Sequence, residues 1–161
     1  MYSISIRINK LSDTKNLAKT IASFCQVGEV LLLKGDLGAG KTTFSKYFIQ
    51  KLSTVKEVTS PTFNIVNIYE GKNFPIYHYD LYRLKSKEEL YELGIEEAFK
   101  IGITLIEWPE YVENIILDDQ IIIYFKHNTK TQQRVAEISL CGRVTKYKNL
   151  LEKHLKNEIE K

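Results

Sequence analysis

The segment GDLGAGKTTF, residues 35–44, combines residue types and spacing that can do chemistry. It fits the pattern G-x-x-x-x-G-K-[ST] of a phosphate-binding loop, with Gly35, Gly40, Lys41 and Thr42 at the fixed positions. Glycines leave backbone N–H groups free to surround a polyphosphate, and the positive end of the following helix adds to the attraction. Lys41 is expected to reach the β- and γ-phosphates, and the Thr42 hydroxyl to bind Mg²⁺. The pattern predicts a nucleoside triphosphate site, without indicating the base, formed by Gly38, Ala39, Gly40, Lys41, Thr42 and Thr43.

A second acidic group is expected near this loop, because Mg²⁺ prefers oxygen ligands and has to be held beside the phosphates. The run ITLIEW places Glu107 directly after a short apolar stretch, where a buried strand would end. Aspartate is commoner at such a position, and glutamate has a longer reach. We interpret Glu107 as a second Mg²⁺ ligand; the alternative is that it only ends a strand in solvent.

Two further segments carry polar side chains that suit a triphosphate site. SPTF, residues 60–63, follows the helix after the loop, and its Ser60 and Thr62 are candidate γ-phosphate sensors or simply turn residues. In HYDLYRL, residues 78–84, Asp80 can orient or deprotonate an attacking water. Arg83 can neutralise phosphate charge or form an ion pair with Asp80. His78 is interpreted as a packed histidine rather than a ligand.

The elements that position these residues are indicated by hydrophobic periodicity and capping signals. Ser12 or Asp13 is expected to cap the first helix, while Ser86 with Glu89 forms a capping box and Gly94 ends that helix. Strands alternate with helices in the first two thirds, which predicts an α/β fold: a mixed, largely parallel β-sheet flanked by helices, similar to P-loop NTPases. Strands are expected over 3–8, 30–35, 63–69, 75–80, 102–108, 120–127 and 134–140, and helices over 12–25, 42–52, 86–94 and from 145 onward.

Length and composition limit the class of protein. The 161 residues, 43% of them hydrophobic, suit one domain over 1–161 with a real core. No apolar run approaches the roughly 20 residues that span a bilayer, and the N-terminus lacks a signal peptide, so we expect a cytoplasmic protein without a membrane segment. Cys25 and Cys141 are expected to be buried thiols rather than a disulfide. The lysine-rich tail, 145–161, predicts a solvated amphipathic helix, with a nucleic-acid-binding face as the alternative.

Four segments in this order and spacing, GDLGAGKTT, SPTF, HYDLYRL with ELGIEE, and IEWPE, together resemble the bacterial TsaE (YjeE) family. The resemblance extends from the first strand to about Arg134. It implies a small ATPase that uses ATP and Mg²⁺ in making N6-threonylcarbamoyladenosine at position 37 of tRNA. It also implies a TsaB–TsaD heterodimer as partner, weak activity alone, and only indirect contact with tRNA.

The resemblance also assigns roles to individual residues. The family's phosphate loop falls on Gly35 to Thr43, its Mg²⁺ ligands on Thr42 and Glu107, its aspartate on Asp80 and its sensor loop on residues 60–62. Trp108 matches the family's tryptophan beside the acid, and Arg134 matches a basic residue near the adenine. Together with the loop chemistry, this identifies Lys41, Asp80 and Glu107 as the candidate catalytic residues. The tail after Thr145 lies outside the family's pattern.

Three other functions are alternatives to this one. A small-molecule kinase needs an arginine-bearing lid, and arginine is sparse here. A GTPase switch needs a guanine-binding N-K-x-D segment, which the sequence lacks. A nucleotide-gated binding module without useful turnover is compatible with the same residues.

Overall fold

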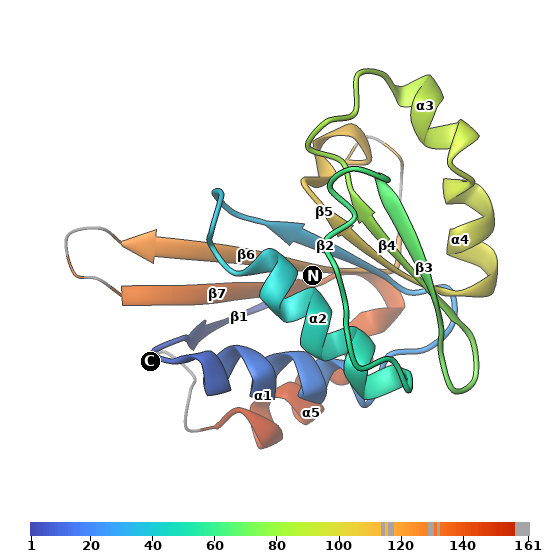
Figure 1. The fold of residues 1–161 in the computed structure, drawn as a ribbon. Coiled ribbons are helices and arrows are strands. Elements are labelled where there is room, and N and C mark those ends of the chain that lie inside the picture. Colours follow the sequence, from blue (N-terminus) through green and yellow to red (C-terminus); the bar gives the residue numbers. More distant parts are fainter. Residues whose placement is uncertain (114, 116–117, 129–130, 132, 157–161) are drawn as a thin grey trace.

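The computed structural model describes the chain except for residues 114, 116–117, 129–130, 132 and 157–161. Its centre is a seven-stranded sheet in the order β1-β7-β6-β2-β5-β4-β3 (Figure 1). The strands are β1 (Tyr2–Arg7), β2 (Val30–Lys34), β3 (Val66–Glu70), β4 (Pro75–Asp80), β5 (Ile103–Glu107), β6 (Gln120–Asn128) and β7 (Gln133–Leu140). The helices are α1 (Leu11–Ala22), α2 (Lys41–Leu52), α3 (Lys87–Glu92), α4 (Ile95–Ile101) and α5 (Lys148–His154), with the short 3-10 helices η1 (Pro109–Tyr111) and η2 (Gly142–Tyr147).

The four central strands, β6, β2, β5 and β4, run parallel to one another. Apolar residues of these strands enter the cores on both faces, because a parallel sheet is covered by helices on both faces. Antiparallel pairing occurs at the two sides, where β3 pairs with β4 and where β7 joins β6 to β1. The expected mixed, largely parallel sheet flanked by helices is confirmed.

The helices form a layer on each face of the sheet (Figure 1). One core contains buried residues of α1, α2 and α5 together with Leu31, Leu33 and Leu105 of the central strands. The other core contains residues of α3 and α4 packed on Leu32 and Ile106. Neighbouring residues of a strand thus enter opposite cores, as the period of two requires. This packing fixes which face of each strand meets α2, the helix that follows the phosphate loop.

The carboxyl ends of the parallel strands meet at one edge of the sheet. Glu107, at the end of β5, is paired in register with Leu33 of β2 on one side and with Asp80 of β4 on the other. The loop that follows β2 therefore emerges beside both acidic residues. Ligands of open α/β sheets bind at this edge, so the topology brings together the residues that the sequence singled out.

Several element predictions need correction. The sequence signals do not indicate a helix over residues 95–101, but these residues form α4. Gly94, expected to end a helix, is also the N-cap of α4, with φ +72°. β3 begins at Val66 rather than at residue 63, after a turn over residues 62–64. The first helix begins at Leu11, and Asp13 lies inside it, accepting backbone N–H groups of Asn9 and Lys10 at 2.8 and 3.0 Å.

The tail is helical through η2 and α5, and the rest of the predicted segment, residues 157–161, lies outside the described residues. Its apolar side chains enter the core beneath α1, namely Val144, Tyr147, Leu151 and Leu155. Both cysteines are free, but only Cys25 is buried, since Cys141 is partly exposed. Over the part of the chain that is described, no helix is long and apolar enough to cross a membrane.

Candidate nucleotide site

The phosphate loop runs between β2 and α2 in a backbone shape that depends on glycine. Gly40 is the N-cap of α2 with φ +115°, in the left-handed region that residues with side chains rarely adopt. Gly35 has φ +136°, and a Cβ there would lie 2.5 Å from the carbonyl oxygen of Phe125 in β6. The loop is therefore pressed against the neighbouring strand and leaves its N–H groups at the N-terminus of α2.

Lys41 is folded back into this loop. Its side chain is only 5% exposed, and its Nζ donates to the carbonyl oxygens of Gly35 and Asp36, the latter at 2.9 Å. The same Nζ lies 3.9 Å from the ring centroid of Trp108, a cation–π contact. Burial lowers the pKa of Lys41, while the nearby Glu107 carboxylate opposes this shift. The ammonium is therefore placed beside the loop before any phosphate group enters.

Glu107 does not end its strand in solvent, so the alternative considered for it from the sequence is wrong. The residue is 1% exposed, and its carboxylate accepts three hydrogen bonds. Thr42 Oγ1 donates to Oε2 at 2.8 Å, whereas Ser45 Oγ and His78 Nε2 meet Oε1 at 3.1 and 2.7 Å. The two residues predicted to bind Mg²⁺, Thr42 and Glu107, are thus brought into direct contact.

Asp80 lies next to Glu107 and is held by a different set of donors. Thr62 Oγ1 donates to Oδ2 at 3.2 Å, and the Tyr82 backbone N–H donates to Oδ1 at 3.1 Å. Thr62 is itself 2.6 Å from Ser60 Oγ, so the SPTF segment is tied to Asp80. The predicted Asp80–Arg83 ion pair is not formed, because the Arg83 guanidinium lies over the ring of Phe63 at 4.9 Å.

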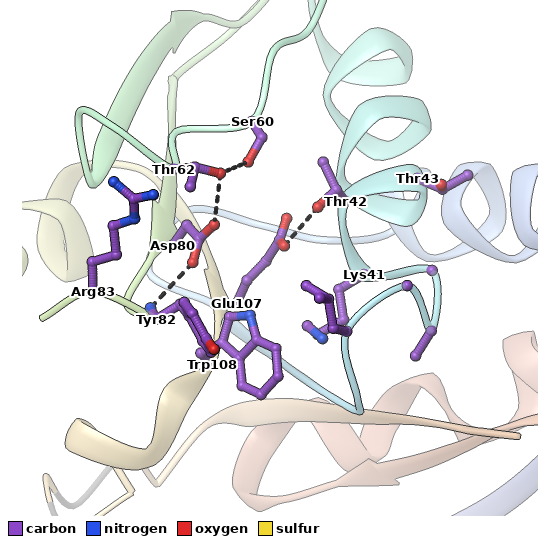
Figure 2. Close-up of a pocket in the computed structure, with 14 residues that line it drawn as sticks. Lys41, Thr42, Thr43, Ser60, Thr62, Asp80, Tyr82, Arg83, Glu107 and Trp108 are labelled. Carbon is purple, nitrogen blue, oxygen red and sulfur yellow. Dashed lines mark hydrogen bonds between the residues drawn. The ribbon is translucent and has the colours of Figure 1, made fainter.

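One cavity of about 300 Å³ is lined by Lys41, Thr42, Ser60, Thr62, Asp80, Arg83 and Glu107, together with residues of the phosphate loop (Figure 2). In this view Asp80 and Glu107 lie between Arg83 on one side and Thr42 and Lys41 on the other. Trp108 and Tyr82 pack together at the rim, with ring centroids 4.9 Å apart. The cavity brings basic, acidic and hydroxyl groups from four separate segments of the chain within reach of one phosphate group.

A second cavity, of about 440 Å³, lies on the other side of the same loop. It shares Gly38, Ala39, Gly40 and Thr43 with the first cavity. Other parts of its wall come from Asn9, in the segment that leads into α1, from Thr14 in α1, and from Arg134 in β7. Of the sequence-predicted site residues, Arg134 is therefore the one that stands apart from the acidic groups, on the opposite side of the loop.

Three contributors to the site were missed from the sequence, or assigned no part in it. Ser45 is one helical turn after Lys41 and Thr42, and that spacing alone places it on the same face of α2. His78 is packed, as expected, but its contact with Glu107 was not foreseen. Tyr82 contributes a backbone N–H and a rim ring, for which the sequence carries no signal.

The donor set suits Mg²⁺ bound together with a nucleotide. No group of three or more His, Cys, Asp and Glu side chains capable of holding a metal occurs among the described residues. Mg²⁺ is usually held by one or two protein ligands, with water and phosphate oxygens completing its shell. One hydroxyl, Thr42, and one carboxylate, Glu107, at the edge of the cavity match that requirement.

Comparison with known proteins gives a consistent picture. Residues 8–136 match the family model described as "Threonylcarbamoyl adenosine biosynthesis protein TsaE". A protein of Rickettsia conorii named "tRNA threonylcarbamoyladenosine biosynthesis protein TsaE" is 48% identical over 113 residues, 68% of this chain and 63% of that protein. A Bacillus subtilis protein of the same name is 36% identical over 146 residues, 86% of this chain and 91% of its own.

The fold has a solved relative as well. The crystal structure of YdiB from Bacillus subtilis has a TM-score of 0.75 at 31% identity, covering 97% of this chain and 96% of that one. This likeness supports the α/β architecture expected of P-loop proteins. The chain spans somewhat less than two thirds of the Rickettsia conorii relative but most of the Bacillus subtilis relative.

Proposed function

The chain belongs to the TsaE family, and on that premise we propose that it binds and hydrolyses ATP with Mg²⁺ in the biosynthesis of tRNA threonylcarbamoyladenosine. The observation that carries the proposal is the contact of Thr42 with Glu107 at 2.8 Å, directly beside the buried ammonium of Lys41. A hydroxyl, a carboxylate and a cation at a glycine loop are the parts from which phosphate-loop enzymes build a triphosphate site.

Each residue has a task in this proposal. Lys41 exchanges its loop carbonyls for phosphate oxygens and offsets charge at the β- and γ-positions. Thr42 and Glu107 hold Mg²⁺, which supplies charge neutralisation at the phosphates when bound. Asp80, fixed by Thr62 and Tyr82, orients or deprotonates the attacking water. Arg134 and the second cavity take the nucleoside, because that cavity adjoins the loop on the side away from the acids.

We further propose that the protein is cytoplasmic and works with a TsaB–TsaD heterodimer, meeting tRNA through that complex. Exposed apolar side chains around the catalytic cavity support a protein partner there. Leu37 is 85% exposed, Phe63 84% and Tyr82 62%, and the first and third of these line the cavity. Such residues are typical of surfaces that a partner covers. An uncovered site leaves the attacking water free to exchange, which is consistent with weak activity alone.

The deciding experiment measures phosphate release from ATP and from GTP by the purified protein, alone and with the matching TsaB–TsaD pair. Lys41→Ala serves as the blank, and Lys46→Ala, an exposed lysine on the same helix, as the matched control. We expect ATP-selective release that rises with the pair and disappears only in Lys41→Ala. Release that ignores the pair but responds to a small-molecule acceptor would indicate a kinase, and binding without release a nucleotide-gated module.

A further inference from the structure

His78 is a buried polar residue to which the proposed reaction gives no task. It lies in β4, two residues before Asp80, with its side chain 0% exposed. Its Nε2 is 2.7 Å from Glu107 Oε1, and its buried Nδ1 has no hydrogen-bond partner among the residues that the structure describes. A carboxylate can only accept, so His78 Nε2 carries the proton of this hydrogen bond. The imidazole therefore donates one hydrogen bond, to one oxygen of Glu107.

The two oxygens of Glu107 are divided between the core and the cavity. Oε1 accepts hydrogen bonds from both His78 and Ser45 on the core side, whereas Oε2 accepts one from Thr42 at the cavity edge. His78 is in register with Leu105, two residues before Glu107 in β5, so its side chain approaches Glu107 from the neighbouring strand. Two donors on one oxygen leave the carboxylate no freedom to rotate. The other oxygen is thereby presented to the hydroxyl of Thr42.

A purely structural role for His78 would be to fill space between the sheet and α2. Its surroundings argue against that, because Leu105, its register partner, and Ile76, two residues earlier in β4, belong to the apolar core. An imidazole there, with one nitrogen unpaired, costs more than an aliphatic side chain of similar volume. Glutamate has one more rotatable bond than aspartate, so a carboxylate at this position needs additional anchoring to point in one direction.

We propose that His78, together with Ser45, is a positioning residue that fixes Glu107 so that Oε2 faces Thr42 and a Mg²⁺ ion. The inference rests on the proposed nucleotide-binding function. Groups that hydrogen-bond a metal-ligating side chain typically change metal affinity by 10–100-fold when they are removed. His78 acts only through Glu107, since its ring is fully buried and does not line the cavity.

Two substitutions separate positioning from packing. His78→Gln carries an amide N–H at about the place of Nε2, whereas His78→Asn carries it near Nδ1, where there is no partner. Both are polar and both disturb the core. The readout is the gain in affinity for a non-hydrolysable ATP analogue on adding Mg²⁺, measured by calorimetry. We expect His78→Asn to lose about tenfold or more of this gain and His78→Gln to keep most of it, with Mg²⁺-free affinity unchanged in both.

Three further variants serve as controls for this test. Thr104→Val is the matched control, because Thr104 is also buried with an unpaired hydroxyl but faces the other core, and it should leave the gain unchanged. If His78→Asn fails to fold, Ser45→Ala is expected to lose part of the gain by removing the second anchor. The inference is overturned if His78→Asn keeps the full Mg²⁺-dependent gain in affinity, or if Ser45→Ala keeps it where that variant replaces His78→Asn. It is also overturned if His78→Gln loses as much of this gain as His78→Asn does. Glu107→Ala tests the proposed function separately: if it keeps the full gain, the metal site itself is wrong.

Discussion

Asp80 and Glu107 are register partners at the carboxyl ends of β4 and β5, but their carboxylates are held in different ways. Glu107 accepts hydrogen bonds from three side chains, two of them inside the core. Asp80 is held by the Thr62 hydroxyl and the Tyr82 backbone N–H, both from loop segments beside the cavity. The two acids are therefore suited to different work: Glu107 to a fixed metal contact, and Asp80 to a group whose surroundings can rearrange when a nucleotide binds.

This difference predicts the effect of Asp80→Asn. The amide keeps the size of the side chain but cannot take a proton, so phosphate release should fall by at least about 100-fold. Affinity for a non-hydrolysable ATP analogue should stay within about threefold, because Asp80 is assigned to the water and not to the nucleotide. Glu110→Gln, which removes an exposed acid near Lys41, is the control and should retain turnover. Unchanged release from Asp80→Asn would reduce Asp80 to a structural acceptor for Thr62 and Tyr82.

Trp108 predicts a spectroscopic signal at the site. It is the only tryptophan in the chain, it has φ +56°, and its ring lies 3.9 Å from Lys41 Nζ. A nucleotide that draws Lys41 from Gly35 and Asp36 onto phosphate oxygens must also change this cation–π contact. Tryptophan emission should therefore change on adding ATP and follow the binding isotherm measured by calorimetry. Emission that stays constant at saturating ATP would mean that Lys41 keeps its present contacts when nucleotide is bound.

Arg134 is expected to contact the nucleoside and not the phosphates. Its cavity joins the loop on the side away from Lys41 and the acids. Arg134→Ala should therefore weaken ATP binding by about three- to tenfold while leaving inorganic tripolyphosphate binding unchanged. Arg143→Ala is the matched control, because that exposed guanidinium pairs with Asp119 and lines neither nucleotide cavity. Equal loss of both ligands would place Arg134 at the phosphates instead.

The phosphate loop and both acids could be predicted because their signals are local. VLLLKG is apolar and short, the glycine pattern follows at once, and parallel strands bring their carboxyl ends to one edge. Thr42 and Glu107 are 65 residues apart, yet each lies directly beside the sequence pattern that predicts it, the glycine pattern for Thr42 and the apolar run for Glu107. Each was predicted separately as a Mg²⁺ ligand, and their direct contact follows from the topology of the sheet.

What could not be predicted depends on register and on contacts across elements. His78 reaches Glu107 only because β4 and β5 pair so that His78 lies opposite Leu105. An ion pair with Asp80 was one of two roles open to Arg83 from the sequence, but the chain leaves β4 at Asp80 and directs Arg83 onto Phe63. The helix α4 was missed because Gly94 ends one helix and begins the next within a single residue.

The C-terminal tail is expected to contribute stability and not nucleotide binding. Tyr147 is 4% exposed and donates its hydroxyl proton to Glu29 Oε1 at 2.7 Å, joining the tail to the residue just before β2. Burial, with the Glu29 carboxylate, raises the pKa of Tyr147. Tyr147→Phe removes one donor from a buried carboxylate and should lower the free energy of unfolding by about 1–3 kcal/mol in urea titration. Lys146 Nζ, 3.7 Å from Glu29, sets the loss toward the lower end of that range.

The same variant should bind ATP normally, because Glu29 lies at the amino end of β2 and the phosphate loop at its carboxyl end. Tyr91→Phe is the control, since Tyr91 is 51% exposed and its hydroxyl is far less desolvated, so stability should change by less than about 0.5 kcal/mol. A Tyr147→Phe protein as stable as wild type would mean that the tail is held by its apolar contacts alone. Weakened ATP binding at unchanged stability would instead couple the tail to the loop through β2, which the rigid packing of that strand between β5 and β6 argues against.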